Sequence, residues 1–204
     1  MSKSGSSSHL VSAYGLFWDR GQVGWPSGKG RPWQLLGYRG INAGTVRVCD
    51  FRRARGLYIL YNDYGPNYVG IARGTQGIGQ RLLSHDRTRN DAQKTWTRFS
   101  WFSFDDVVDV GKTGWSEIRL RSALKEVDAA TVVFDMEALM IKVLGTAIQG
   151  SQIDMNFNRG QAVKQWHQIT YDDLYPGRPL GKVDITRLTD WTLRSYMDEI
   201  DGEG

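Results

Sequence analysis

The fold is decided by the stretch GLYILYNDYGPNYVGIA, residues 56–72. Residues 57–61 are aromatic and aliphatic, and residues 68–72 are again mostly apolar. Between them, Asn, Asp, Gly and Pro supply the residue types that favour a tight turn. The pattern predicts two antiparallel strands joined as a β-hairpin.

The chain after this hairpin predicts a helix over residues 78–89, a strand over residues 98–104, and further helices over residues 116–127 and 130–148. The last of these carries an apolar stripe at helical spacing, which we expect to face the sheet: Val133, Met136, Met140, Val143, Leu144 and Ala147. We therefore expect an α/β (α+β) fold, a small three-stranded antiparallel sheet flanked by helices.

The flanking regions predict three additional parts. Residues 1–13 are expected to be a flexible leader, and residues 14–55 a small β-rich module with strands over residues 33–38 and 45–49. The central domain would cover residues 56–160. Residues 161–204 are expected to form an extension with a helix over residues 185–200.

Composition places the chain among ordinary globular proteins. Of its 204 residues, 40% are hydrophobic and 24% charged, enough apolar material for a core. The single cysteine, Cys49, and three histidines make a zinc site improbable. Apolar runs are too short to span a bilayer, and the first residues lack a secretion signal, so cytoplasmic residence is the default expectation.

Charge is divided unevenly along the chain, although the net charge is only +4. Residues 1–104 hold 15 Lys and Arg against 5 Asp and Glu, whereas residues 105–204 hold 11 against 17. A basic half favours a polyanionic partner. The charge division alone is explained equally well if the basic half and the acidic half of the chain neutralise each other within the fold.

Two glycine-containing segments fail as nucleotide-binding motifs. Residues 111–113 read GKT, but Asp106 stands where a phosphate-binding loop requires glycine. Gly74, Gly77 and Gly79 do not have the spacing of the dinucleotide fingerprint.

A more informative group combines two phenols, a guanidinium, an imidazole and a carboxylate. Tyr58 and Tyr68 can be neighbours on one face of the paired strands, and Arg81 and His85 share one side of the following helix. Glu137 lies in the apolar stripe of residues 130–148, where an ionised carboxylate requires a cation or a position at the rim of a cleft.

Residues 56–158 resemble the GIY-YIG nuclease domain. Gly56-Leu57-Tyr58 corresponds to the first motif, with Leu for Ile, and Tyr68-Val69-Gly70 to the second, with Val for Ile. The resemblance implies a catalytic set in matching order along the chain: Tyr58, Tyr68, Arg81, His85, Glu137 and Asn158.

The resemblance implies a divalent-metal-dependent endonuclease, and the short chain favours a stand-alone enzyme of restriction, defence or repair type as the expectation. Glu137 would bind Mg²⁺ (or Mn²⁺), which prefers one or two carboxylates together with phosphate and water. Arg81 would grip the scissile phosphate. Tyr58 is the candidate base, provided that nearby cations favour its phenolate, and His85 would relay its proton or orient it. Tyr68 would position water or phosphate, and Asn158 would form hydrogen bonds within the site.

The expected partner is DNA, with RNA not excluded. Basic and aromatic residues that cluster in sequence around the proposed site would contact its backbone: Arg52, Arg53, Arg55, Arg73, Arg87, Arg89, Lys94, Trp96 and Arg98. Trp96 either stacks on a base or, the better interpretation, packs in the core.

Two rival functions stay open: a nucleic-acid-binding module that keeps the fold without catalysis, and an RNase or toxin-type nuclease. Taken singly, each site residue except Glu137 also fits a purely structural role. No residue pattern decides the oligomeric state, and a dimer is possible because a double-strand cut needs two active sites or two visits.

Overall fold

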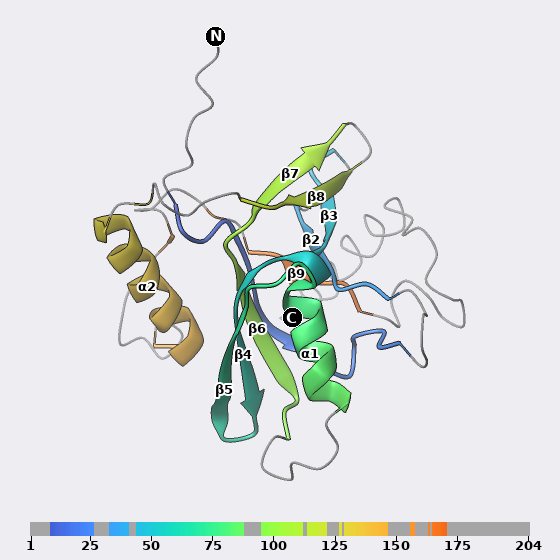
Figure 1. Ribbon diagram of the computed structural model, residues 1–204, viewed down its shortest axis with the longest axis vertical. Helices are drawn as coiled ribbons and strands as arrows, with labels where there is room; N and C mark the ends of the chain where they lie inside the picture. Colours follow the sequence, from blue (N-terminus) through green and yellow to red (C-terminus); the bar gives the residue numbers. More distant parts are fainter. Residues whose placement is uncertain are drawn as a thin grey trace, which may run out of the picture.

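The computed structural model describes residues 9–26, 33–40, 44–87, 95–111, 114–121, 127, 129–146, 156–157, 163 and 165–170. These residues form a mixed α/β structure with two sheets (Figure 1). The first sheet has the strand order β1-β6-β4-β5. Its strands are β1 (Ala13–Asp19), β4 (Gly56–Asn62), β5 (Gly65–Ala72) and β6 (Arg98–Ser103).

The second sheet has the order β7-β8-β3-β2-β9. Its strands are β2 (Leu36–Arg39), β3 (Arg47–Asp50), β7 (Asp106–Val110), β8 (Trp115–Arg119) and β9 (His167–Gln168). β3 and β8 pair in parallel, and the other neighbours are antiparallel. The strands predicted over residues 33–38 and 45–49 are thus present as β2 and β3.

The predicted hairpin is confirmed. β4 and β5 pair antiparallel, with Tyr58 opposite Gly70 and Leu60 opposite Tyr68. The prediction of a mixed fold with an antiparallel sheet is also correct, but the sheet has four strands where three were expected. The additional strand is β1, which pairs with β6 on the side away from β4.

The two faces of the first sheet are covered by different helices. Alternate residues of β4 point to opposite faces, as the pleat requires. Tyr58 and Leu60 pack in the cluster that contains buried residues of α1 (Gly77–Arg87), whereas Ile59 and Tyr61 pack with buried residues of α2 (Ala129–Leu144). In Figure 1, α1 lies to the right of β4 and β5, and α2 stands to their left.

The start of α1 is set by close packing on the 3-10 turn η1 (Phe51–Arg53). A Cβ at Gly77 would lie 2.4 Å from the carbonyl oxygen of Arg52, and one at Gly79 would lie 2.8 Å from the Arg52 Cα. Gly77 also has φ +66°, a conformation that side chains disfavour. The two glycines therefore allow α1 to approach η1, and this contact fixes where its later residues lie.

The prediction of a helix that begins at residue 116 and ends at residue 127 is wrong, because residues 115–119 form strand β8. The segment before it, DVVDV, is rich in β-branched valine and forms β7, and Gly111 and Gly114 in the connecting turn both have positive φ. The apolar spacing of Trp115 and Ile118 fits one turn of helix as well as a strand, and pairing with β3 and β7 decides between them.

The α2 helix forms close to its predicted range but is rotated relative to the prediction. Most of the stripe expected to face the sheet is exposed, with Val133 at 67% and Leu144 at 50%, whereas Val143 is buried. Ala147 and the helix predicted over residues 185–200 lie outside the described residues.

No α-helix in the described part of the chain is both long enough and apolar enough to span a bilayer.

Candidate active site

A tyrosine and a histidine from two different elements meet above the first sheet. The Tyr58 hydroxyl on β4 lies 2.9 Å from Nε2 of His85 on α1, within hydrogen-bonding distance. Tyr58 is almost fully buried, and His85 is half-buried. The contact joins the hairpin to the helix that packs over it, as expected from the sequence.

Tyr68 completes a group of three rings. It lies diagonally across the hairpin from Tyr58, because Leu60 is its direct partner and Gly70 is the partner of Tyr58. The Tyr68 ring centroid is 4.7 Å from that of His85, edge to face, and 6.1 Å from that of Tyr58. Tyr68 is 36% exposed, so it forms the solvent side of the group.

Gly70 makes room for this arrangement. A Cβ at position 70 would lie 2.3 Å from both Cζ and the hydroxyl oxygen of Tyr58. The phenol therefore lies directly across the neighbouring strand, a position that any side chain at residue 70 would obstruct.

Arg81 lies one turn before His85 on α1 and is exposed. Its positive charge acts on Tyr58, where it lowers the phenol pKa. Burial and the neighbouring Tyr68 phenol have the larger, opposite effect, and the pKa of Tyr58 is raised to about 12. Tyr58 thus keeps its proton at neutral pH, and the expectation that cations favour its phenolate is not met.

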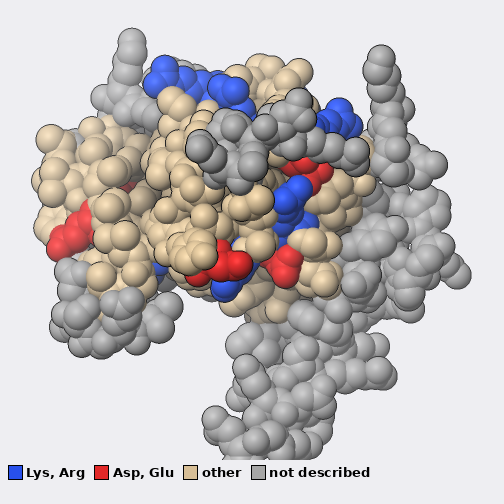
Figure 2. Space-filling model, turned by 90° about the horizontal axis from the view of Figure 1, so that it is seen from below, with Lys and Arg blue, Asp and Glu red and all other residues tan. Residues whose placement is uncertain are grey.

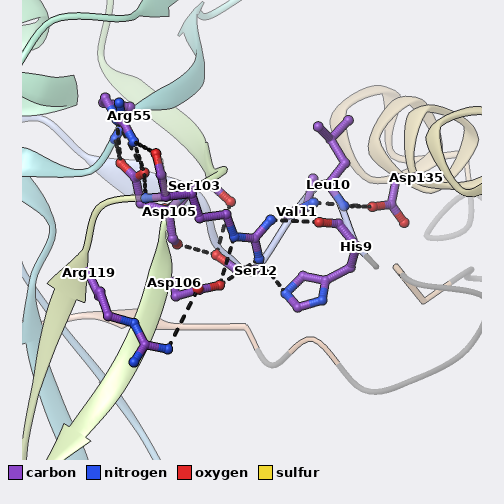
Figure 3. A network of polar contacts seen from close by, with 11 residues as sticks. His9, Leu10, Val11, Ser12, Arg55, Ser103, Asp105, Asp106, Arg119 and Asp135 are labelled. Carbon is purple, nitrogen blue, oxygen red and sulfur yellow. Dashed lines mark hydrogen bonds and ion pairs between the residues drawn. The ribbon is translucent and has the colours of Figure 1, made fainter. Parts of the chain in front are cut away.

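Glu137 does not join this group. It is exposed on α2, and α2 packs against the other face of the sheet through Ala138, Leu139 and Val143. The reason is visible in Figure 3: Asp135 accepts hydrogen bonds from the backbone amides of Leu10 and Val11, at 3.0 and 3.1 Å. Residues two apart on a helix are separated by about 200°, so a buried Asp135 turns Glu137 outward.

The residues around the cluster do not fit the Mg²⁺ site that the resemblance implies. Its carboxylate, Glu137, belongs to the opposite face, and Asp86, next to His85 in sequence, forms an ion pair with Arg20 at 3.0 Å. Within the described residues, no group of three or more His, Cys, Asp or Glu side chains is placed to hold a metal. Among the described residues, those shown to meet at the cluster are two phenols, an imidazole and a guanidinium.

Two of the arginines expected to contact nucleic acid are held by acidic residues. Arg52 pairs with Asp50 at 2.7 Å and lies over the Trp33 ring. Arg55 binds buried Asp105, with its Nε 2.9 Å from Oδ2. Burial alone would raise the pKa of Asp105, but the hydrogen bonds from the Arg55 side chain and from two backbone amides hold it below its usual value.

The other basic positions are mostly exposed: Arg53, Arg73, Arg87 and Arg98. On the face seen in Figure 2, Lys and Arg form separate groups, with acidic residues among them. Arg89, Lys94 and Asn158 lie outside the described residues. Trp96 is buried, with the guanidinium of Arg20 4.7 Å above its ring, so its packing role is confirmed.

Sequence reasoning thus located Tyr58, Tyr68, Arg81 and His85 together and missed Asp135. A signal was present, since Asp135 is a second acidic residue within a mainly apolar helix, two positions from Glu137. Without its partners at residues 10 and 11, nothing indicated which of the two carboxylates would be buried.

No protein-family model, no curated protein and no solved structure matches this chain. The chemistry of the cluster is therefore argued from its geometry. A guanidinium is a permanent cation that suits phosphate, an imidazole exchanges protons near neutral pH, and phenols donate hydrogen bonds.

Proposed function

We propose that this chain is a nuclease that cleaves phosphodiester bonds in a nucleic acid, with Tyr58, Tyr68, Arg81 and His85 as its active site. The observation that supports this most is the 2.9 Å contact between Tyr58 and His85. A histidine held by a buried phenol, one helical turn from an exposed arginine, combines a proton-transfer group with a phosphate-binding cation.

Each residue has a distinct role in this proposal. Arg81 neutralises charge that builds on the phosphoryl oxygens, and its fork-shaped guanidinium can contact two of them. His85 transfers protons at the scissile bond. Tyr58, which stays protonated, orients the imidazole, and Tyr68 on the solvent side donates a hydrogen bond to the substrate. The exposed arginines would add affinity through the phosphate backbone.

The experiment is a cleavage assay with the purified chain on plasmid, single-stranded DNA and RNA, each with Mg²⁺, with Mn²⁺ and with chelator. Arg81→Ala is expected to reduce cleavage about 10²-fold to 10³-fold, the usual cost of removing one group that stabilises the transition state. Arg119→Ala is the matched control, because Arg119 is an exposed arginine on the second sheet, 67% exposed.

Cleavage of none of the substrates would refute the proposal. So would cleavage that Arg81→Ala and Tyr58→Phe leave unchanged, because the activity would then come from another site or from a contaminant.

A second candidate is a nucleic-acid-binding module without catalysis. It is favoured by one observation, the position of Glu137 on the far face of the sheet from the cluster. This candidate predicts salt-dependent binding of nucleic acid with no cleavage under any metal condition. Gel-shift titrations at several salt concentrations, on the same substrates, separate it from the nuclease.

A further inference from the structure

Arg20 connects the end of β1 to the last turn of α1. It follows β1 directly, and its backbone amide donates to the carbonyl oxygen of Thr97 at 2.9 Å, so the pairing of β1 with β6 fixes its backbone. Its side chain reaches α1, where Nε and Nη2 each lie 3.0 Å from Oδ1 of Asp86. Asp86 lies 66 positions later in the chain. This ion pair therefore joins an N-terminal strand to the helix that carries His85.

The same guanidinium is held on another side by Trp96. Its Nη1 donates to the carbonyl oxygen of Trp96 at 3.1 Å, and its Cζ lies 4.7 Å from the centre of the Trp96 ring. Trp96 is buried and contacts Phe99 of β6 edge to face, with ring centroids 5.9 Å apart. All three side-chain nitrogens of Arg20 thus have a partner, an arrangement that a planar, fork-shaped guanidinium can make and a lysine cannot.

Asp86 benefits from this cation because of its place in α1. The C-terminal end of a helix carries partial negative charge, so an acidic residue is unfavourable there and a nearby cation is favourable. Asp86 is the penultimate residue of α1, which ends at Arg87. The start of α1 is fixed by packing on η1, and Arg20 fixes its end. His85 lies in this last turn, directly before Asp86.

We propose that Arg20 is a positioning residue of the candidate active site, which acts through Asp86 to hold the His85 imidazole beside Tyr58. This inference rests on the proposed nuclease function and adds a residue from the N-terminal part of the chain to that site. Tyr58 contacts Nε2 of the imidazole at 2.9 Å, whereas Arg20 holds the helical turn that carries it. Loss of Arg20 should therefore displace the imidazole and leave every group of the site in the chain.

The test compares the full chain with Arg20→Gln, which removes the charge and the fork. Arg39→Gln is the matched control, because Arg39 also forms an ion pair with an aspartate, Asp109 at 3.3 Å, and also lies over a tryptophan ring, that of Trp166 at 5.2 Å. These partners lie on β7 and next to β9, not on α1. The two substitutions thus remove similar interactions at different places.

Two measurements separate positioning from a general loss of stability. The His85 imidazole resonances in NMR spectra, assigned with His85→Ala, should shift in Arg20→Gln and stay unchanged in Arg39→Gln. In the cleavage assay, Arg20→Gln should lower kcat about 10-fold to 10²-fold with a smaller effect on KM, because a misplacement of about 1 Å costs up to about 10²-fold. Arg39→Gln should leave both constants unchanged.

A double-substitution cycle tests whether Arg20 acts through Asp86. In a chain that already carries Asp86→Ala, the substitution Arg20→Gln should have no further effect on kcat, because the contact between the two residues is already lost. Losses that multiply would show that Arg20 acts by another route and would overturn the inference.

A milder variant keeps the test decisive if Arg20→Gln does not fold. Arg20→Lys keeps the positive charge but makes fewer of the contacts, so it should shift the His85 resonances in NMR spectra recorded on the folded protein. Resonances that shift in neither Arg20 variant, or that shift equally in Arg39→Gln, would overturn the inference. Absence of cleavage by the wild type would refute the nuclease proposal, and the His85 resonances would still decide whether Arg20 holds the imidazole in place.

Discussion

The Tyr58 phenol lies across Gly70 of the neighbouring strand, where an added Cβ would come within 2.3 Å of its hydroxyl oxygen. This contact links a backbone feature to the chemistry, because the same hydroxyl meets His85 on α1. Gly70 therefore affects the position of the His85 imidazole indirectly, through Tyr58.

Gly70→Ala should displace Tyr58 and disturb His85. Overpacking of this kind costs about 1–3 kcal/mol of stability, and a misplacement of about 1 Å at a catalytic group can cost about 10²-fold in rate. Chemical denaturation and the cleavage assay measure the two effects. Gly74→Ala is the matched control, since a Cβ at Gly74 would meet nothing within 4 Å. Equal effects of the two substitutions would contradict this account.

The Tyr58 phenol should titrate near pH 12 in the folded protein, about two units above the ordinary value of about 10. Its contribution to stability is complete below pH 10. This stabilisation is lost as pH rises from 10 to 12, because over that range Tyr58 releases its phenol proton in the unfolded chain and keeps it in the folded chain. The stability difference between the wild type and Tyr58→Phe should therefore narrow over this range. Denaturation curves at several alkaline pH values provide the measurement, and a difference that stays constant would count against the raised pKa.

Asp135 and Glu137 should differ in their importance for stability. Asp135→Ala leaves the backbone amides of Leu10 and Val11 without their buried partner, at a cost of about 1–3 kcal/mol for each unsatisfied group. Glu137→Ala removes an exposed side chain and should change stability by less than about 0.5 kcal/mol. Urea midpoints of the two variants test this. A large loss with Glu137→Ala and none with Asp135→Ala would show that the helix is rotated the other way.

The parts of the fold that the sequence predicted correctly depend on neighbours along the chain. The hairpin β4–β5 follows from a turn-forming segment between apolar runs, and α1 from apolar residues at helical spacing. Tyr58, Tyr68, Arg81 and His85 lie on these elements, so their meeting was predictable as well. Each is within about 30 residues of the others, and local geometry decides their positions.

The features that were missed depend on distant partners. The fourth strand of the first sheet is β1, whose paired residues in β6 lie 79 to 90 positions away along the chain. The rotation of α2 depends on the hydrogen bonds that Asp135 accepts from Leu10 and Val11, which lie 125 and 124 positions earlier in the chain. An apolar stripe ordinarily faces the core, but the buried amide of Val11 and the partly buried amide of Leu10, which need an acceptor, outweigh it here. No pattern within the helix carries that information.

The ion pair of Arg55 and Asp105 should make stability fall in acid. Asp105 is buried, and hydrogen bonds from Arg55 and Arg121 hold its pKa below the usual value. The ionised Asp105 carboxylate therefore stabilises the fold above about pH 4, the ordinary pKa of an aspartate. This stabilisation is lost as pH falls through the pKa that Asp105 has in the folded protein. Asp105→Asn should cost about 3 kcal/mol near neutrality, because it leaves the Arg55 guanidinium without its buried anion.

The stability difference between the wild type and Asp105→Asn should shrink as pH falls below 4, measured by denaturation at a series of acidic pH values. Asp63→Asn, at an exposed turn position, is the control and should track the wild type throughout. His9 also makes the folded protein less stable in acid. Burial and the neighbouring Arg121 lower the pKa of His9, so protonating it disfavours the folded state. A wild type and an Asp105→Asn variant that lose stability in parallel would show that the carboxylate is not held ionised by its arginines.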